Sequence, residues 1–213
     1  MIQRDLYLQK IIDYMWDGQI KVITGIRRAG KSTLLFDLFY DYLLKKSVKA
    51  ENIIKLQLDK RKDSKYRNPI VLAEYVENQV SKSKEKFYLF IDEIQFCYSV
   101  PDPDNEGYEI TVYDMLNELK DYKNLDVYVT GSNSKMLSKD ISTEFRGRSS
   151  QIHVYPLSFS EFHATKGGDK RDNFDSYMIY GGLPYLLHLK NDEQYKQYLT
   201  NLFDEVYIKD IVE

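Results

Sequence analysis

The segment Gly25-Ile26-Arg27-Arg28-Ala29-Gly30-Lys31-Ser32 fits the pattern G-x-x-x-x-G-K-[ST] at every fixed position. It follows the short apolar run 20–24 and opens a stretch with helical spacing, which is the context this pattern requires. Its glycines let backbone N–H groups close around phosphate oxygens, and the start of a helix adds positive potential. The sequence therefore predicts a phosphate-binding loop, in which Lys31 reaches the β- and γ-phosphates and the Ser32 hydroxyl ligates Mg²⁺.

Two adjacent carboxylates, Asp92 and Glu93, follow the fully apolar run Tyr88-Leu89-Phe90-Ile91. A buried parallel strand of this kind delivers its last residues to the carboxyl edge of the sheet, where ligands of such sheets bind. An ordinary charged strand end is the alternative. Together with the phosphate loop, the pair predicts that Asp92 holds Mg²⁺ through its water shell and that Glu93 polarises a water for attack on the γ-phosphate.

Two later segments carry side chains suited to the same chemistry. Thr130-Gly131-Ser132-Asn133 ends the next strand at the same edge, where a hydroxyl or amide could orient the attacking water. Phe145-Arg146-Gly147-Arg148 precedes the last strand, and an arginine there, Arg148 ahead of Arg146, suits the charge on a transferring phosphoryl group. A plain turn and a solvated basic loop are the respective alternatives.

Strands and helices alternate along the first three quarters of the chain. Such alternation predicts a parallel sheet with helices on both faces. We expect strands at 20–24, 53–58, 87–91, 127–130 and 152–155, with helices from 34, at 70–80 and at 113–119. The 53–58 strand alternates apolar and polar residues, as an edge or half-covered strand does.

Strand signals stop after Pro156, and only helical spacing follows. We expect helices at 159–163, 174–180, 184–189 and 195–211, with Gly181-Gly182-Leu183-Pro184 forming a tight, fixed turn between two of them. The predicted division is a sheet domain over 1–156 and a small helical domain over 157–213.

Composition limits the class of protein. The 213 residues are 43% hydrophobic and 30% charged, which fits a globular rather than a disordered chain. The net charge of −3 excludes electrostatic nucleic-acid binding by the chain as a whole, so such binding would need a local patch. The single cysteine, Cys97, excludes an internal disulfide and a multi-cysteine metal site.

The N-terminus is charged where a signal peptide needs an apolar run, and the apolar run 87–91 is far short of a membrane span. We therefore expect a cytoplasmic protein without membrane contact.

Three features resemble functional motifs, but ordinary structural roles are the favoured interpretation of each. The segment Asp102–Gly107 begins like a calcium loop but lacks its last ligand, the basic run 60–67 is interrupted by acids, and the three histidines lack metal-ligand spacing.

Together these motifs resemble the AAA-type and STAND-type branch of P-loop ATPases. More narrowly, the chain resembles the bacterial and archaeal ATP-binding family whose members carry an uncharacterised nuclease-like C-terminal domain. The segments that carry this resemblance span nearly the whole chain, and the later ones are the more specific: 25–33, Leu89-Phe90-Ile91-Asp92-Glu93-Ile94-Gln95, 129–132, Gly147-Arg148, Pro156-Leu157-Ser158-Phe159-Ser160-Glu161-Phe162 and Tyr180-Gly181-Gly182-Leu183-Pro184.

The resemblance implies ATP or ADP with Mg²⁺ as ligands, and an AAA-type P-loop NTPase sheet followed by a small helical lid. It places the strand bearing Thr130 between the phosphate-loop strand and the Asp92 strand. It assigns Thr130 and Ser132 to a sensor position and Arg148 to a finger supplied to a neighbouring copy, so a homo-oligomer is an expected partner. Residues expected at the nucleotide are Gly25, Arg28, Ala29, Gly30, Lys31, Ser32, Thr33 and Pro184, and Arg4 could match a family arginine that touches the adenine.

Three departures from the family stand out. The segment 96–111 is longer than the usual link, and no arginine of the AAA sensor-two kind follows the lid turn. Members are usually longer, so we expect the C-terminal domain to be missing here and nucleic acid to be a partner only through that domain.

The predicted function is an ATP-binding, Mg²⁺-dependent ATPase module whose nucleotide state drives a conformational output. One alternative is a STAND-like switch that binds ADP tightly and barely hydrolyses ATP. The other is a small-molecule kinase on the same phosphate loop. Glu93 directly after Asp92, and the lack of an arginine-rich lid, argue against the kinase.

Overall fold

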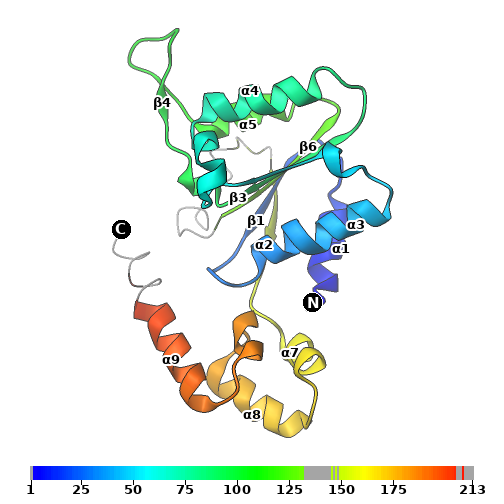
Figure 1. The fold of residues 1–213 in the computed structure, drawn as a ribbon, viewed down its shortest axis with the longest axis vertical. Coiled ribbons are helices and arrows are strands. Elements are labelled where there is room, and N and C mark those ends of the chain that lie inside the picture. Colours follow the sequence, from blue (N-terminus) through cyan, green and yellow to red (C-terminus); the bar gives the residue numbers. More distant parts are fainter. Residues whose placement is uncertain (1, 132–144, 146, 148, 205–207, 209–213) are drawn as a thin grey trace.

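A parallel sheet forms the centre of the molecule in the computed structural model, which describes residues 2–131, 145, 147, 149–204 and 208 (Figure 1). Its five strands lie in the order β2-β3-β6-β1-β7, and every neighbouring pair is parallel. The strands are β1 Ile20–Thr24, β2 Ile53–Gln57, β3 Phe87–Asp92, β6 Leu125–Thr130 and β7 Ser149–His153. This architecture confirms the predicted α/β fold, the edge position of β2 and the central position of β6.

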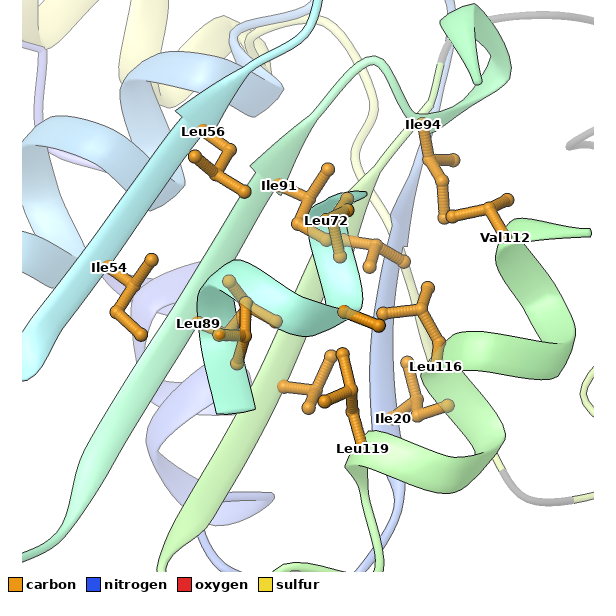
Figure 2. Close-up of a cluster of buried hydrophobic side chains, with 14 of the residues drawn as sticks. Ile20, Ile54, Leu56, Leu72, Leu89, Ile91, Ile94, Val112, Leu116 and Leu119 are labelled. Carbon is orange, nitrogen blue, oxygen red and sulfur yellow. The ribbon is translucent and has the colours of Figure 1, made fainter. Parts of the chain in front are cut away.

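Each sheet face carries its own apolar cluster, because successive side chains of a strand point to opposite faces. On one face Leu89 and Ile91 of β3 pack with α4 (Pro69–Val80) and α5 (Val112–Leu119), as Figure 2 shows. On the other face Tyr88 and Phe90 pack with the helical run that follows the phosphate loop. All six residues of β3 and all six of β6 are buried, so both strands run through the middle of the core.

The helical run after β1 has three consecutive parts. It consists of α2 (Lys31–Thr33), a π-helical stretch η1 (Leu34–Phe39) and α3 (Tyr40–Lys45). Its apolar residues lie at the spacing that the sequence indicated, and Leu34, Leu35, Phe39 and Leu43 are buried against the sheet. The spacing of apolar residues did not predict that part of this run, Leu34–Phe39, is π-helical.

An N-terminal helix, α1 (Asp5–Asp13), covers the same face as this run and was not predicted. Its buried residues are Tyr7 and Ile11, one helical turn apart. The remaining short elements are η2 (Ala50–Asn52), η3 (Arg61–Arg67), η4 (Ile94–Phe96) and a small hairpin of β4 (Val100–Pro101) and β5 (Glu109–Ile110). The loop Asp102–Gly107 joins the two strands of that hairpin.

Helices gather beyond β7, at one end of the sheet (Figure 1). They are α7 (Phe159–Lys166), α8 (Lys170–Tyr180), η6 (Pro184–His188) and α9 (Asp192–Leu202). Side chains of Ser158, Asp169 and Asn191 cap the N-termini of α7, α8 and α9. These helices share a third apolar cluster, whose buried members are Leu157, Phe162, Leu183, Leu186, Tyr195 and Leu202. Among the residues described, no helix is long and apolar enough to span a membrane.

Gly182 explains why the turn between α8 and η6 is so small. The Leu157 N–H donates to the Gly182 carbonyl (2.7 Å), so two chain segments lie in direct backbone contact. A Cβ at position 182 would lie 2.1 Å from the Leu157 carbonyl oxygen and 2.8 Å from Cε2 of Tyr177. The turn can form only because no side chain occupies this gap.

We therefore expect Gly182→Ala to destabilise the helical end by about 1–3 kcal/mol, the usual cost of overpacking. Urea unfolding followed through tyrosine fluorescence and circular dichroism would measure the loss. Ser160→Ala, an exposed position on α7, is the control and should unfold like the wild type. An unchanged midpoint for Gly182→Ala would mean that the Leu157 segment moves freely.

Candidate functional site

The carboxyl edge of the sheet brings together side chains from three separate segments. The Ser32 hydroxyl, at the start of the helical run, donates to Oδ1 of Asp92 over 3.1 Å. The Thr130 hydroxyl, at the end of β6, donates to the same Asp92 oxygen. This contact follows from the strand order, because β3 and β6 are neighbours and end at the same level.

The phosphate loop lies between β1 and α2. Lys31 is only 4% exposed and folds back over the loop, where its Nζ donates to the Gly25 carbonyl (2.9 Å) and the Ile26 carbonyl (3.1 Å). Burial lowers the pKa of Lys31, whereas the nearby carboxylates of Glu93 and Asp92 act in the opposite direction. The two carboxylates favour the charged form of Lys31, and its ammonium group is held over the loop by neutral carbonyl oxygens that a phosphate oxygen could replace.

Gly25 has a second role besides flexibility. Its φ is +141°, and a Cβ at this position would lie 2.2 Å from the Val154 carbonyl oxygen. The chain leaving β7 therefore passes directly against the first glycine of the loop. Gly25 is required by this packing as well as by the path of the loop.

Asp92 is buried and is held by the two hydroxyl groups described above. Burial raises the pKa of this carboxyl, and the hydrogen bonds from Thr130 and Ser32 partly offset the rise. A hydroxyl and a carboxylate oxygen in contact are the hard oxygen donors that Mg²⁺ prefers, usually with waters completing its shell. The residues present therefore fit a magnesium ion bound between the loop and β3.

Glu93 follows Asp92 with an unusual backbone. Its φ of 55° lies in the left-handed region, which is uncommon for a residue with a side chain. Its N–H donates to the Thr130 hydroxyl oxygen over 3.1 Å, and its carboxylate accepts a hydrogen bond from the Gln95 amide. Thr130 thus contacts both acidic residues and fixes them relative to each other.

A pocket of about 880 Å³ opens in front of these groups. One wall comes from the phosphate loop and Glu93, and the other comes from the helices after β7. A Cβ at Gly30 would lie 3.9 Å from Cγ of Pro184, so the turn before η6 lies over the loop, as the lid interpretation requires. The lining residues are Ile2, Arg4, Arg28, Gly30, Lys31, Ser32, Thr33, Glu93, Leu157, Thr165, Lys166, Pro184, Tyr185, Leu187 and His188.

Most of the predicted site residues lie at this edge. Gly30, Lys31, Ser32, Thr33, Glu93, Arg28 and Pro184 line the pocket, and Asp92 and Thr130 lie directly behind it. The Arg28 guanidinium lies 5.3 Å from the centre of the Tyr198 ring of α9. Ser132, Arg146 and Arg148 lie outside the described residues.

Gln95 was not predicted as a site residue: it contacts Glu93, and its position two residues downstream was the only signal. Arg4, which the resemblance placed near the adenine, lines the pocket; its guanidinium donates to the Tyr155 and Ala29 carbonyls and is paired with Glu161. A contact between residues 4 and 161 has no signature in sequence spacing.

Two relatives of the chain are described as uncharacterised proteins. An uncharacterised protein of Haemophilus influenzae is 35% identical over 217 residues, which cover 99% of this chain and 50% of that protein. An uncharacterised protein of Methanocaldococcus jannaschii is 28% identical over 229 residues, covering 100% of this chain and 45% of that protein. The chain spans about half the length of both relatives.

Solved structures share the fold at low identity. A Walker-type ATPase of Pyrococcus abyssi superposes with a TM-score of 0.58 at 15% identity, over 88% of this chain and 65% of that one. AMPPCP-bound DnaA of Aquifex aeolicus gives 0.52 at 14%, over 95% and 63%. The Aeropyrum pernix ORC1 protein in complex with DNA gives 0.52 at 12%, over 84% and 50%.

Residues 17–163 match the family model described as an AAA domain. This segment contains the phosphate loop, the Asp92–Glu93 pair, Thr130 and the start of the helical end. With the parallel sheet and the pocket at its carboxyl edge, the match shows that the chain belongs to the AAA domain family.

Proposed function

We propose that the chain is an ATP-binding, Mg²⁺-dependent ATPase module whose nucleotide state drives a conformational change. The observation that carries the proposal is the meeting of Lys31 and Ser32 with Asp92 and Glu93 at one edge of the sheet, in front of a pocket of about 880 Å³. Phosphate-binding and water-activating groups have to meet in this way for phosphoryl transfer to water.

The residues divide the work as follows. The backbone N–H groups of the loop hold phosphate oxygens, and Lys31 exchanges its two carbonyl partners for the β- and γ-phosphates. Ser32 and Asp92 hold Mg²⁺, which when bound neutralises charge on the phosphates. Glu93 accepts a proton from the attacking water, and Thr130 keeps the two carboxylates in register.

The apolar part of the pocket lining suits a nucleotide base. Ile2, Leu157, Pro184 and Leu187 contribute to it, and they come from the N-terminal segment and from the chain after β7. A base held there would connect the sheet, which we take as residues 1–156, to the helical lid at 157–213. This connection is the proposed origin of the conformational output.

Turnover measurements test the proposal. Purified chain should release phosphate from ATP in the presence of Mg²⁺, and addition of chelator should stop the release. ADP should form at the same rate with or without added small-molecule acceptors. A kinase would form ADP slowly until its acceptor was supplied, and would then transfer the phosphoryl group to the acceptor without releasing phosphate. No phosphate release under any of these conditions would exclude the ATPase.

The contact between Gln95 and Glu93 favours one second candidate, a nucleotide-locked switch. A carboxylate that accepts a hydrogen bond from an amide is less available to a water, so hydrolysis would be slow in this arrangement. Nucleotide identified after purification separates the two. Tightly retained ADP with negligible turnover indicates the switch, and exchangeable nucleotide with turnover indicates the ATPase.

Arg148 is the proposed finger for a neighbouring copy. An arginine supplied in trans stabilises the transition state only in an assembled complex, so turnover per molecule should rise steeply with protein concentration. Arg148→Ala should abolish this rise while ATP affinity stays unchanged. Turnover per molecule that is independent of concentration, in wild type and variant alike, would show that Arg148 acts on no neighbour.

A further inference from the structure

Arg4 is a buried cation that joins three parts of the molecule. It is 5% exposed, and its guanidinium donates to the Tyr155 carbonyl (2.7 Å) and to the Ala29 carbonyl (3.3 Å). Its Nε lies 3.0 Å from Oε1 of Glu161. These partners belong to the connection after β7, to the phosphate loop and to α7, so one planar side chain connects the loop with the first helix of the lid.

The bond to Ala29 has a consequence for the loop. In a trans peptide the C=O of one residue and the N–H of the next point in opposite directions. With the Ala29 carbonyl directed at Arg4, the Gly30 N–H is directed away from Arg4. Gly30 directly precedes the helical run, where backbone N–H groups have no partner within the helix. Arg4 therefore sets the direction of one of the loop's free donors.

The ion pair with Glu161 restrains the other end of Arg4; the Nε lies 3.0 Å from the carboxylate but makes no hydrogen bond to it. The Glu161 carboxylate uses one oxygen for Arg4 and the other for the N–H (2.8 Å) and hydroxyl (2.9 Å) of Ser158, which closes the first turn of α7. The Arg4 guanidinium also lies 4.5 Å from the centre of the Tyr7 ring of α1, which restricts its orientation. The pair is partly buried, with the Glu161 side chain 22% exposed, and it restrains Arg4 and the start of α7 relative to each other.

We propose that Arg4 is a positioning residue that couples the phosphate loop to the lid. A phosphate that draws the Gly30 N–H toward itself tightens the Ala29–Arg4 bond, and through Glu161 this bond holds the start of α7. In the other direction, a displaced α7 rotates the Ala29–Gly30 peptide and weakens phosphate binding. This inference rests on the proposed nucleotide site and adds a mechanical link between that site and the helical end.

ADP affinity and amide hydrogen exchange of residues 159–166 test the link on the full chain. In the wild type, saturating ADP should slow exchange in α7. Arg4→Met keeps the stem but removes the guanidinium, so ADP should bind about 10- to 100-fold more weakly, the usual effect of losing hydrogen bonds to a charged group. When this variant is saturated with ADP, α7 should show no added protection.

Lys10→Met is the matched control. Lys10 is an exposed cation on α1, which Arg4 directly precedes, and it also faces the Tyr7 ring, at 5.7 Å; within the part of the chain that the structure describes, it has no bond to the loop or to α7. This variant should bind ADP and protect α7 as the wild type does. Glu161→Gln tests the link from the side of α7, because it removes the charge that pairs with Arg4 but keeps an oxygen that can accept from Ser158. If Arg4→Met fails to fold, Glu161→Gln alone shows whether the link exists. It too should lose the ADP-induced protection.

The outcomes separate this inference from the function it rests on. Wild-type chain that binds no ADP would overturn the nucleotide site and the link together. Wild-type binding with full protection of α7 in ADP-saturated Arg4→Met or Glu161→Gln would overturn the link alone. Arg4→Met with wild-type ADP affinity would overturn it as well, because the Ala29–Gly30 peptide would then be independent of Arg4.

Discussion

Glu93→Gln should lower ATP turnover by about 10²–10⁴-fold, the usual contribution of a positioned general base. The amide keeps the size and shape of the side chain but cannot accept the proton of the attacking water. ATP affinity should stay unchanged, because Lys31, Ser32 and Asp92 are untouched. Phosphate release at saturating ATP measures the first effect, and titration with a fluorescent ATP analogue measures the second.

Asp92→Asn is the comparison variant, because it should affect nucleotide binding whereas Glu93→Gln should affect turnover. Asp92 lies next to Glu93 but is bonded to the Ser32 and Thr130 hydroxyls, so its loss should weaken nucleotide binding in the presence of Mg²⁺. Equal loss of binding in both variants would mean that Glu93 is structural. Unimpaired turnover in Glu93→Gln would place the base elsewhere, and a wild type without turnover would leave the switch as the explanation.

Lys31→Ala should reduce affinity for ATP and ADP by at least about 10²-fold. For ATP the loss combines charge-assisted hydrogen bonds to the β- and γ-phosphates with removal of a nearby positive charge, and for ADP it combines the bond to the β-phosphate with removal of the same charge. Isothermal titration with ADP would measure it. Because Lys31 also bonds the Gly25 and Ile26 carbonyls, thermal unfolding should be recorded alongside, to show that the variant is folded at the temperature of the titration.

Lys45→Ala is the control for this variant. Lys45 is an exposed lysine at the far end of the same helical run, and its removal changes the net charge by the same amount. Nucleotide affinity should equal that of the wild type. Wild-type affinity in folded Lys31→Ala would refute the phosphate loop as the binding site.

The sheet and much of the site edge followed from local sequence. The apolar run before Asp92 predicted a strand buried on both faces, and β3 is buried throughout. The alternating residues before position 58 predicted an edge or half-covered strand, and β2 lies at the edge. Both predictions succeeded because successive side chains of a strand point to opposite faces of the sheet. A continuous apolar run therefore indicates two buried faces, and alternation indicates one.

Features that depend on long-range contacts could not be predicted. Helix α1 is short, its helical N-cap position is Arg4 without a capping side chain, and its burial depends on distant residues of the sheet. The β4–β5 hairpin has strands of two residues each, too short for a period. The pairing of Arg4 with Glu161 and the bonding of Thr130 to Asp92 are products of the fold, and no local pattern encodes them.

Gly25 shows that residues of one motif can be needed for different reasons. Because a side chain at this position would overlap the Val154 carbonyl, the glycine is needed to build the sheet whether or not a nucleotide is ever bound. A chain of this fold that bound no nucleotide would still need Gly25, whereas the bonds of Lys31 to the loop carbonyls and of Ser32 to Asp92 could be replaced. Among homologous chains, a retained Gly25 alone would therefore be no evidence of nucleotide binding, whereas Lys31 and Ser32 retained with it would be.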